Sequence, residues 1–171
     1  MSTPTVRIAI DPGKAGGIAC KYPGGAVVLY SMPDTESGVA MLLLSIVDAA
    51  RVEGWACEAV IERVVGFVGR GQPGSAMFTF GRGVGVLVGL LMAHRVPFRE
   101  VTPQSWLKAI GAGTTNGRTK GEWKRCLLDL SRKRHPGVAG LTLKTCDALL
   151  LLTATEPSLS PVACAVGISH Q

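Results

Sequence analysis

Aromatic and charged residues are both scarce in this chain of 171 residues. Trp, Tyr and Phe make up only 5% of the sequence, so aliphatic side chains must fill the core. Charged residues make up 18% and apolar residues 47%, a balance that excludes an intrinsically disordered chain. The length favours a single domain with one core.

Paired cysteines and long apolar runs are also missing. The five cysteines are odd in number and none follows the C-x-x-C spacing, which argues against a disulfide framework or a zinc ribbon. We therefore expect reduced, mostly buried thiols in a cytosol-like compartment. The first residues lack a basic segment followed by an apolar one, so no secretion signal is expected. The longest apolar segment, Val84–Ala93, is too short to span a bilayer, so no membrane is expected as a partner.

Acidic residues are outnumbered, 12 against 18 basic ones, and the two kinds are unevenly distributed. Residues 63–134 carry 13 basic and three acidic side chains, a local net charge of +10, whereas the rest of the chain has a net charge of −4. A basic middle of this kind indicates a polyanionic partner such as nucleic acid. The alternative is the solvated surface of ordinary helices.

Hydrophobic periodicity and turn residues predict an α/β fold with a five-stranded mixed sheet. Three short strands separated by Pro-Gly turns form an antiparallel meander, and a helical crossover makes the fourth strand parallel to the first. The expected strands are 6–10, 16–21, 26–31, 57–62 and 97–101. The expected helices are 36–52, 75–94, 103–110, 120–135 and 141–155, with a mobile loop at 63–74. We expect one domain over residues 1–156, followed by a loose tail at 157–171.

The helix expected over 75–94, with Ser75 as its N-cap, has glycines every four residues, at Gly81, Gly85 and Gly89. Each glycine costs about 1 kcal/mol relative to alanine inside a helix. A close approach of another backbone would offset that cost. The partner is either the sheet of the same chain or a second copy of the protein.

Three acidic residues stand where apolar elements should have none. Asp11 ends the first strand, Glu62 ends the fourth, and Asp147 lies within the apolar last helix. Parallel neighbouring strands bring Asp11 and Glu62 to one sheet edge, and a helix crossing that edge would add Asp147. Converging carboxylates repel one another unless a cation neutralises them, and hard divalent cations, Mg²⁺ first, suit oxygen ligands. Taken singly, Asp11 could cap the Pro-Gly turn and Glu62 could be a surface acid.

These motifs resemble those of the RuvC-type Holliday junction resolvases, which belong to the ribonuclease H-like superfamily. The resemblance covers residues 6–155. In its details the sequence looks closer to the phage and chloroplast branch of the family than to the common bacterial enzyme. The resemblance rests on Asp-Pro-Gly after an apolar strand, VIE on strand four, DALLLL on the last helix, and the segments SAMFTFGRGVGVLVGLL and VTPQSWLKAIGAGTTNGRTKGEW. Asp-Pro-Gly alone also occurs in sugar kinases and actin-like ATPases. Those proteins need a second lobe and a second phosphate loop, which this sequence lacks.

The resemblance implies site residues as well as a ribonuclease H-like fold. Asp11, Glu62 and Asp147 match the family's metal ligands for Mg²⁺, with Mn²⁺ as a substitute. Lys108 and Lys120 match lysines that matter for cleavage. Lys144 stands where many members have a fourth acid, so it is a candidate for a charge-stabilising catalytic role. Some family members carry, shortly after the second acid, an aromatic residue that wedges the junction open. The candidate for this role here is Phe67, which could instead be an ordinary loop residue.

The activity implied is that of a structure-specific DNA endonuclease. It would resolve four-way junctions by paired symmetric nicks, through two-metal-ion hydrolysis, as a homodimer that matches the symmetry of the junction. The residues expected to contact DNA are Arg63, Phe67, Arg70, Arg82, Lys108, Arg118, Lys120, Lys124 and Arg125. We expect a cytoplasmic or nucleoid-associated protein, with a viral or organellar source and a helicase partner left open. The alternatives are a catalytically weakened junction-binding module and a ribonuclease H-like nuclease that acts on RNA.

Overall fold

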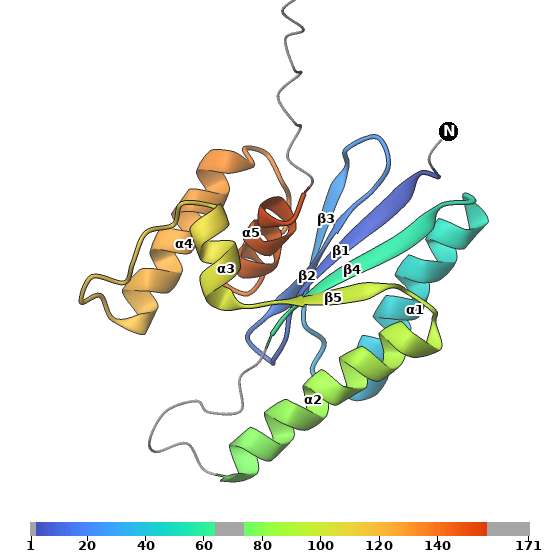
Figure 1. Ribbon diagram of the computed structural model, residues 1–171, viewed down its shortest axis with the longest axis horizontal. Helices are drawn as coiled ribbons and strands as arrows, with labels where there is room; N and C mark the ends of the chain where they lie inside the picture. The colour runs from blue at the N-terminus through green and yellow to red at the C-terminus, as the bar shows by residue number, and fades with distance from the viewer. Residues whose placement is uncertain (1–2, 64–73, 157–171) are drawn as a thin grey trace, which may run out of the picture.

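A computed structural model describes residues 3–63 and 74–156 of the chain, and the fold in this part is one mixed sheet between two layers of helices (Figure 1). The strands are β1 (Thr5–Asp11), β2 (Gly17–Lys21), β3 (Val27–Ser31), β4 (Ala56–Glu62) and β5 (Phe98–Val101). The helices are α1 (Glu36–Val52), α2 (Gly74–Ala93), α3 (Pro103–Ala109), α4 (Lys120–Arg134) and α5 (Cys146–Ala154). The predicted element order is confirmed.

The sheet has the order β3-β2-β1-β4-β5. β1 pairs with β2, and β2 with β3, in antiparallel fashion, whereas β4 is parallel to both β1 and β5. This order and these directions are those of the ribonuclease H-like fold expected from the sequence. Because β1 and β4 run side by side in the same direction, their last residues meet at one edge of the sheet.

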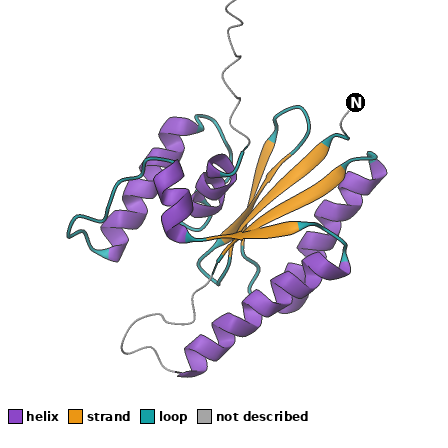
Figure 2. Ribbon diagram, in the orientation of Figure 1, coloured by secondary structure: helices purple, strands orange, loops and turns teal. Residues whose placement is uncertain are grey.

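The two faces of the sheet are covered by different helices (Figure 2). Alternating side chains of β1 divide between two cores: Ile8 and Ile10 pack on the side of α1 and α2, and Ala9 packs on the side of α3, α4 and α5. In β4, Val60 belongs to the second core. Two residues further along their strands, Asp11 and Glu62 therefore belong to the face that α3, α4 and α5 cover.

The last helix is shorter than predicted, because it begins at Cys146 and not at Leu141. Hydroxyl groups before it bond the backbone in place of a further helical turn: Thr145 Oγ1 accepts from Thr142 N at 2.9 Å and donates to Gly140 O at 2.9 Å. Such local bonds compete with helix formation. The predicted burial of this helix is confirmed, but Asp147 lies in its first turn and not in its middle.

Helix α2 is the least buried of the long helices. It begins at Gly74, so Ser75 lies inside the helix and is not its N-cap as predicted. Only Leu87 and Leu91 are buried, while Phe78 and Met92 are 72% and 66% exposed. A Cβ atom built on Gly81, Gly85 or Gly89 would meet no atom of another described element within 4 Å. The alternative in which these glycines pack on the sheet of their own chain is therefore wrong. Among the described residues, α2 alone is long and apolar enough, by length and composition, to cross a membrane. The sequence prediction considered only the shorter segment Val84–Ala93, so its conclusion that the apolar run is too short does not hold for the whole helix.

Candidate active site

Asp11, Glu62 and Asp147 lie at the same edge of the sheet, where β1 and β4 end beside the first turn of α5, but as placed they are not grouped closely enough to hold a metal ion. The parallel register pairs Ile10 with Ile61, so Asp11 and Glu62 follow side by side. α5 packs on β1 and β2 over the same face, which brings Asp147 to this edge. The negative charge of Asp147 raises the pKa of both Asp11 and Glu62. The sequence pattern predicts that these three acids share one edge of the sheet.

The turn after β1 packs closely against Asp11 and α2. Gly13 adopts a φ of +108°, and a Cβ atom there would lie 2.9 Å from the ring of Phe80. A Cβ atom on Gly16 would collide with the carbonyl group of Asp11. These two positions therefore require glycine, and the Pro-Gly-x-x-Gly sequence positions the carboxylate at the sheet edge.

A lysine lies between two of the three acids. The Lys124 ammonium is 3.8 Å from Asp11 Oδ2 and forms a shorter ion pair and hydrogen bond with Asp147 Oδ2. The side chains of Asp11 and Asp147 are only 14% and 16% exposed, and that of Lys124 is 27% exposed. Sequence reasoning had assigned Lys124 to the DNA phosphates and not to this cluster.

Burial dominates the electrostatics of the site. Desolvation, followed by repulsion from Asp147, raises the pKa of Asp11 to about 7, although the charge of Lys124 acts in the opposite direction. Desolvation also raises the pKa of Glu62, against the effect of a hydrogen bond from Trp106. For Lys124, desolvation would lower the pKa, but attraction to Asp147 and the hydrogen bond between them raise it overall. Three acids therefore share one lysine, and Asp11 and Glu62 hold their protons more tightly than free carboxyl groups do.

Glu62 has a fixed partner of its own, the indole ring of Trp106. Trp106 Nε1 donates to Glu62 Oε2 at 2.7 Å, and the ring itself is 3% exposed within the second core. α3 starts at Pro103 after Thr102, whose Oγ1 accepts from Ser105 N at 3.3 Å. The Thr-Pro segment thus directs an N–H group at the carboxylate, a role that sequence analysis did not identify.

The Cys146 thiol lies beside the carboxylate cluster. Cys146 Sγ donates to Asp147 Oδ1 at 3.3 Å. Burial and the charge of Asp147 raise the pKa of the Cys146 thiol to about 12, so it stays protonated. Within residues 3–63 and 74–156, no three His, Cys, Asp or Glu side chains are grouped closely enough, as they lie, to hold a metal ion.

The remaining predicted site residues lie around the cluster rather than in it. Lys108, Lys120 and Lys144 are exposed. Arg63 pairs with Glu100 at 3.8 Å and Arg82 with Glu36 at 2.7 Å. Two further residues are exposed on α4 and the loop before it, Arg118 and Arg125. Phe67 and Arg70 lie outside the described residues.

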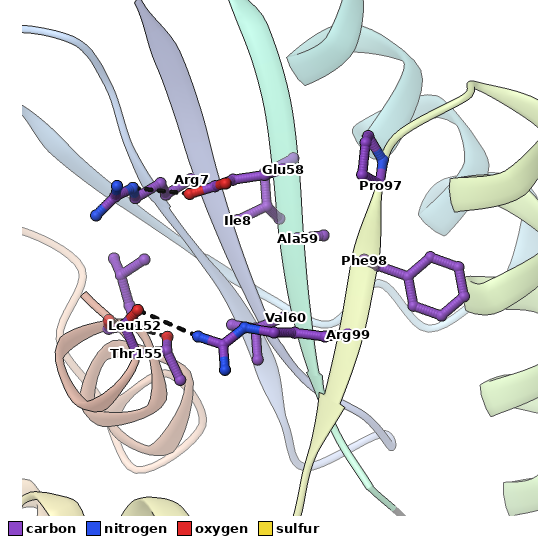
Figure 3. A pocket seen from close by; sticks show the side chains of 10 residues that line it. All are labelled: Arg7, Ile8, Glu58, Ala59, Val60, Pro97, Phe98, Arg99, Leu152 and Thr155. Atoms are coloured by element: carbon purple, nitrogen blue, oxygen red, sulfur yellow. Dashed lines mark hydrogen bonds and ion pairs between the residues drawn. The ribbon is translucent and has the colours of Figure 1, made fainter. Parts of the chain in front are cut away.

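Among the pockets formed by the described residues, two lie beside the sheet, and neither of these is lined by the three acids. One, of about 470 Å³, lies between β4, β5 and α5 (Figure 3). Its Arg7–Glu58 ion pair, 2.8 Å long, lies four residues before Asp11 and Glu62, or about 13 Å along the strands. The other, of about 650 Å³, begins at Gly13 and Lys14 and runs along α2. The first residue that lines this second pocket, Gly13, is two residues after Asp11 in the sequence.

Comparison with known proteins gives a likeness of fold. No known protein family matches the sequence, and no curated protein matches it. Among solved structures, Thermus thermophilus RuvC shares 16% identity over 87% of this chain and 92% of its own, with a TM-score of 0.49. T. thermophilus RuvC in complex with a Holliday junction substrate shares 16% identity over 88% and 91% of the two chains, with a TM-score of 0.48. At this identity the likeness concerns the fold alone.

Proposed function

We propose that this protein is a metal-dependent, structure-specific endodeoxyribonuclease that resolves four-way DNA junctions by paired symmetric nicks. The observation that supports it most is the placement of three acids, from β1, β4 and α5, at one edge of a ribonuclease H-like sheet, where their charges influence one another. Buried acids without enough counter-charge need a cation. The choice of the junction as substrate rests on the sequence motifs that resemble the RuvC-type resolvases.

The donor set suits Mg²⁺ or Mn²⁺ by its chemistry, although the three acids would have to move closer together to hold the ion. All three candidate ligands are carboxylates, the oxygen donors that hard divalent cations prefer. The site already accommodates one cation, the Lys124 ammonium, between Asp11 and Asp147. Asp11, Glu62 and Asp147 are thus the residues that would hold the metal. When bound, Mg²⁺ in a two-metal site activates the attacking water and stabilises the leaving 3′ oxygen.

The protein's own side chains then orient the ligands and the DNA. The Trp106 N–H group fixes Oε2 of Glu62. The other carboxylate oxygen, Oε1, would then be the one that binds the metal. Lys120 begins α4, one helical turn before Lys124, and its charge would offset the negative charge that builds on the scissile phosphate. Lys144, two residues before α5, would contribute a positive charge where a fourth acid is absent.

The exposed basic side chains would grip DNA phosphates. Those on the described part of the chain are Arg63, Arg82, Lys108, Arg118, Lys120 and Arg125. They come from the end of β4, α2, α3, the loop before α4 and α4 itself. Contacts of this kind give affinity and register without reading sequence. Binding should therefore weaken with salt, with a log–log slope of about −0.9 for each phosphate contacted.

A second copy of the chain would cover α2. A four-way junction is close to two-fold symmetric, and two symmetric nicks require two sites related by the same symmetry. The open row of Gly81, Gly85 and Gly89 would allow two α2 helices to approach closely, and the apolar side chains beside the row would be buried on dimer formation.

A second candidate function is a junction-binding module with weakened catalysis. Two features favour it: the missing fourth acid at Lys144, and the Lys124 ammonium held between Asp11 and Asp147. Such a module would bind four-way DNA through the same basic surface but would cut it slowly or not at all in the presence of metal.

One assay separates these functions. The purified protein is incubated with a synthetic four-way junction, a matched linear duplex and an RNA–DNA hybrid, each with Mg²⁺, with Mn²⁺ and with EDTA. Paired nicks in the junction alone, lost in EDTA, support the resolvase. Tight binding of the junction without cutting supports the weakened module. Preferential cutting of the hybrid contradicts the proposal.

A further inference from the structure

Lys124 is held against the carboxylates by packing as well as by charge. Its helix starts at a capping box, in which Glu122 N donates to Thr119 Oγ1 at 3.3 Å and Thr119 N donates to Glu122 Oε2 at 2.8 Å. One turn after Lys124, the buried Leu127 and Leu128 of α4 fasten the helix to the protein. These anchors fix which residue of α4 faces the site.

The same helix is tied directly to the residue before Asp147. Ser131 is fully buried, and its Oγ donates to the carbonyl oxygens of Leu127 at 2.9 Å and of Cys146 at 3.4 Å. α4 and α5 therefore stand in a fixed register, with Lys124 opposite Asp147. The packing of α4 on α5 therefore places Lys124 beside Asp147, so their ion pair does not depend on the chance position of a mobile surface side chain.

The ammonium occupies the place where a divalent cation would have to bind. It contacts oxygens of both Asp11 and Asp147, two of the three candidate ligands. Two cations a few ångströms apart in a partly buried site repel strongly, so the ammonium and a metal ion cannot share these oxygens. The lysine side chain is long and still 27% exposed, which gives its head a route to solvent.

We propose that Lys124 is the built-in counter-ion of the carboxylate cluster, which competes with divalent metal for Asp11 and Asp147 and leaves the cluster when metal binds. The inference rests on the proposed function, since it takes the cluster to be the metal site. Without metal, Lys124 limits the repulsion among the acids. With metal, its released ammonium stands beside the site, free to contact a DNA phosphate.

The test measures metal binding in the absence of DNA. Mn²⁺ is titrated into the wild-type protein and the Lys124→Gln variant, and free Mn²⁺ is followed by its electron paramagnetic resonance signal. Removing the competing charge should tighten the dissociation constant for Mn²⁺ by about tenfold or more. Lys133→Gln removes the same charge from an exposed position on the same helix and should shift the constant less than about twofold. Lys124→Arg, which keeps the charge, should bind Mn²⁺ about as weakly as the wild type.

The outcomes separate this inference from the proposed function. If wild type and Lys124→Gln bind Mn²⁺ with equal affinity, or the variant binds more weakly, the competition is disproved while the metal site stands. If neither protein binds Mn²⁺ at millimolar concentration, both the inference and the proposed metal site are contradicted.

A second measurement uses the wild-type protein, so it does not depend on the folding of any variant. Lysines are acylated briefly with and without Mg²⁺, and the modified residues are identified by mass spectrometry. Lys124 should be protected without metal and react several-fold faster with Mg²⁺, whereas Lys133 should react equally in both. Equal reactivity of Lys124 in both conditions would overturn the inference.

Discussion

Trp106 donates its indole N–H to Glu62 at 2.7 Å, so a buried core residue of α3 holds a carboxylate at the end of β4. The ring packs in the core shared with Val60 and Leu149. The hydrogen bond lowers the pKa of Glu62 and so partly offsets the effect of burial. Trp106 therefore acts as a positioning residue for the candidate active site.

Replacing Trp106 with Phe should remove this hydrogen bond. The pKa of Glu62 should rise, so the acidic limb of the pH–rate profile for junction cleavage should move to higher pH. We expect the cleavage rate at neutral pH to fall about tenfold, and the free energy of unfolding to fall by about 1–3 kcal/mol. Single-turnover cleavage across pH and urea denaturation measure the two effects.

Trp55→Phe is the control for this substitution. Trp55 is half-buried and packs against the other core, with its ring 6.4 Å from that of Tyr22. It should cost stability without moving the pH profile. If Trp106→Phe also left the profile in place, the indole would contribute to packing alone.

The raised pKa of Asp11 predicts how the metal-free protein responds to pH. The carboxyl group has a pKa of about 7 in the folded protein and near 3.8 when unfolded. Between these values the folded state keeps a proton that the unfolded state has lost. The free energy of unfolding should therefore fall as pH rises from about 4 to about 7, and the loss should persist above pH 7.

Asp11→Asn isolates this contribution. In protein freed of metal, the variant should gain stability over the wild type as pH rises from 4 to 7.5, by an amount on the order of a few kcal/mol. Urea denaturation at several pH values measures the difference. A difference that stays constant over this range would contradict the raised pKa.

The glycine row on α2 predicts opposite effects of one substitution on folding and on association. A methyl group at Gly85 meets no atom within 4 Å in the described chain, so Gly85→Ala should stabilise the isolated protomer by up to about 1 kcal/mol. If two α2 helices approach along this row, the same methyl group should weaken the dimer about tenfold or more. Sedimentation and urea denaturation at low concentration measure these two effects.

Gly83→Ala is the matched control, since it makes the same gain in helix propensity but lies off the row. It should stabilise the protomer and leave the dimer unchanged. Equal association of both variants would place the dimer contact elsewhere.

Much of the fold follows from local patterns. The turns after β1 and β2, the crossover helix α1 and the Thr119–Glu122 capping box were all predicted and are all present. The predicted start of the last helix was wrong, because the Thr145 hydroxyl group hydrogen-bonds the backbone of Thr142 and Gly140 in place of a further helical turn. Apolar periodicity alone does not reveal that competition.

The site was predictable only in part. The alternation of strand residues puts Asp11 and Glu62 on one face, and Asp147 stood out as an acid among leucines. The roles of Lys124 and Trp106 depend on how α3, α4 and α5 pack on one another. A lysine on a helix looks the same in sequence whether it faces solvent or a buried carboxylate.

The most direct test of the account compares wild type and Asp11→Asn in Mg²⁺ with the same four-way junction. The variant removes a charged oxygen from the proposed metal site and leaves the basic surface intact. The account predicts that cleavage falls at least a hundredfold while binding in a gel-shift assay stays within about twofold. Asp48→Asn, an exposed acid paired with Arg51, should behave as wild type in both. Cleavage by Asp11→Asn at the wild-type rate would contradict the account.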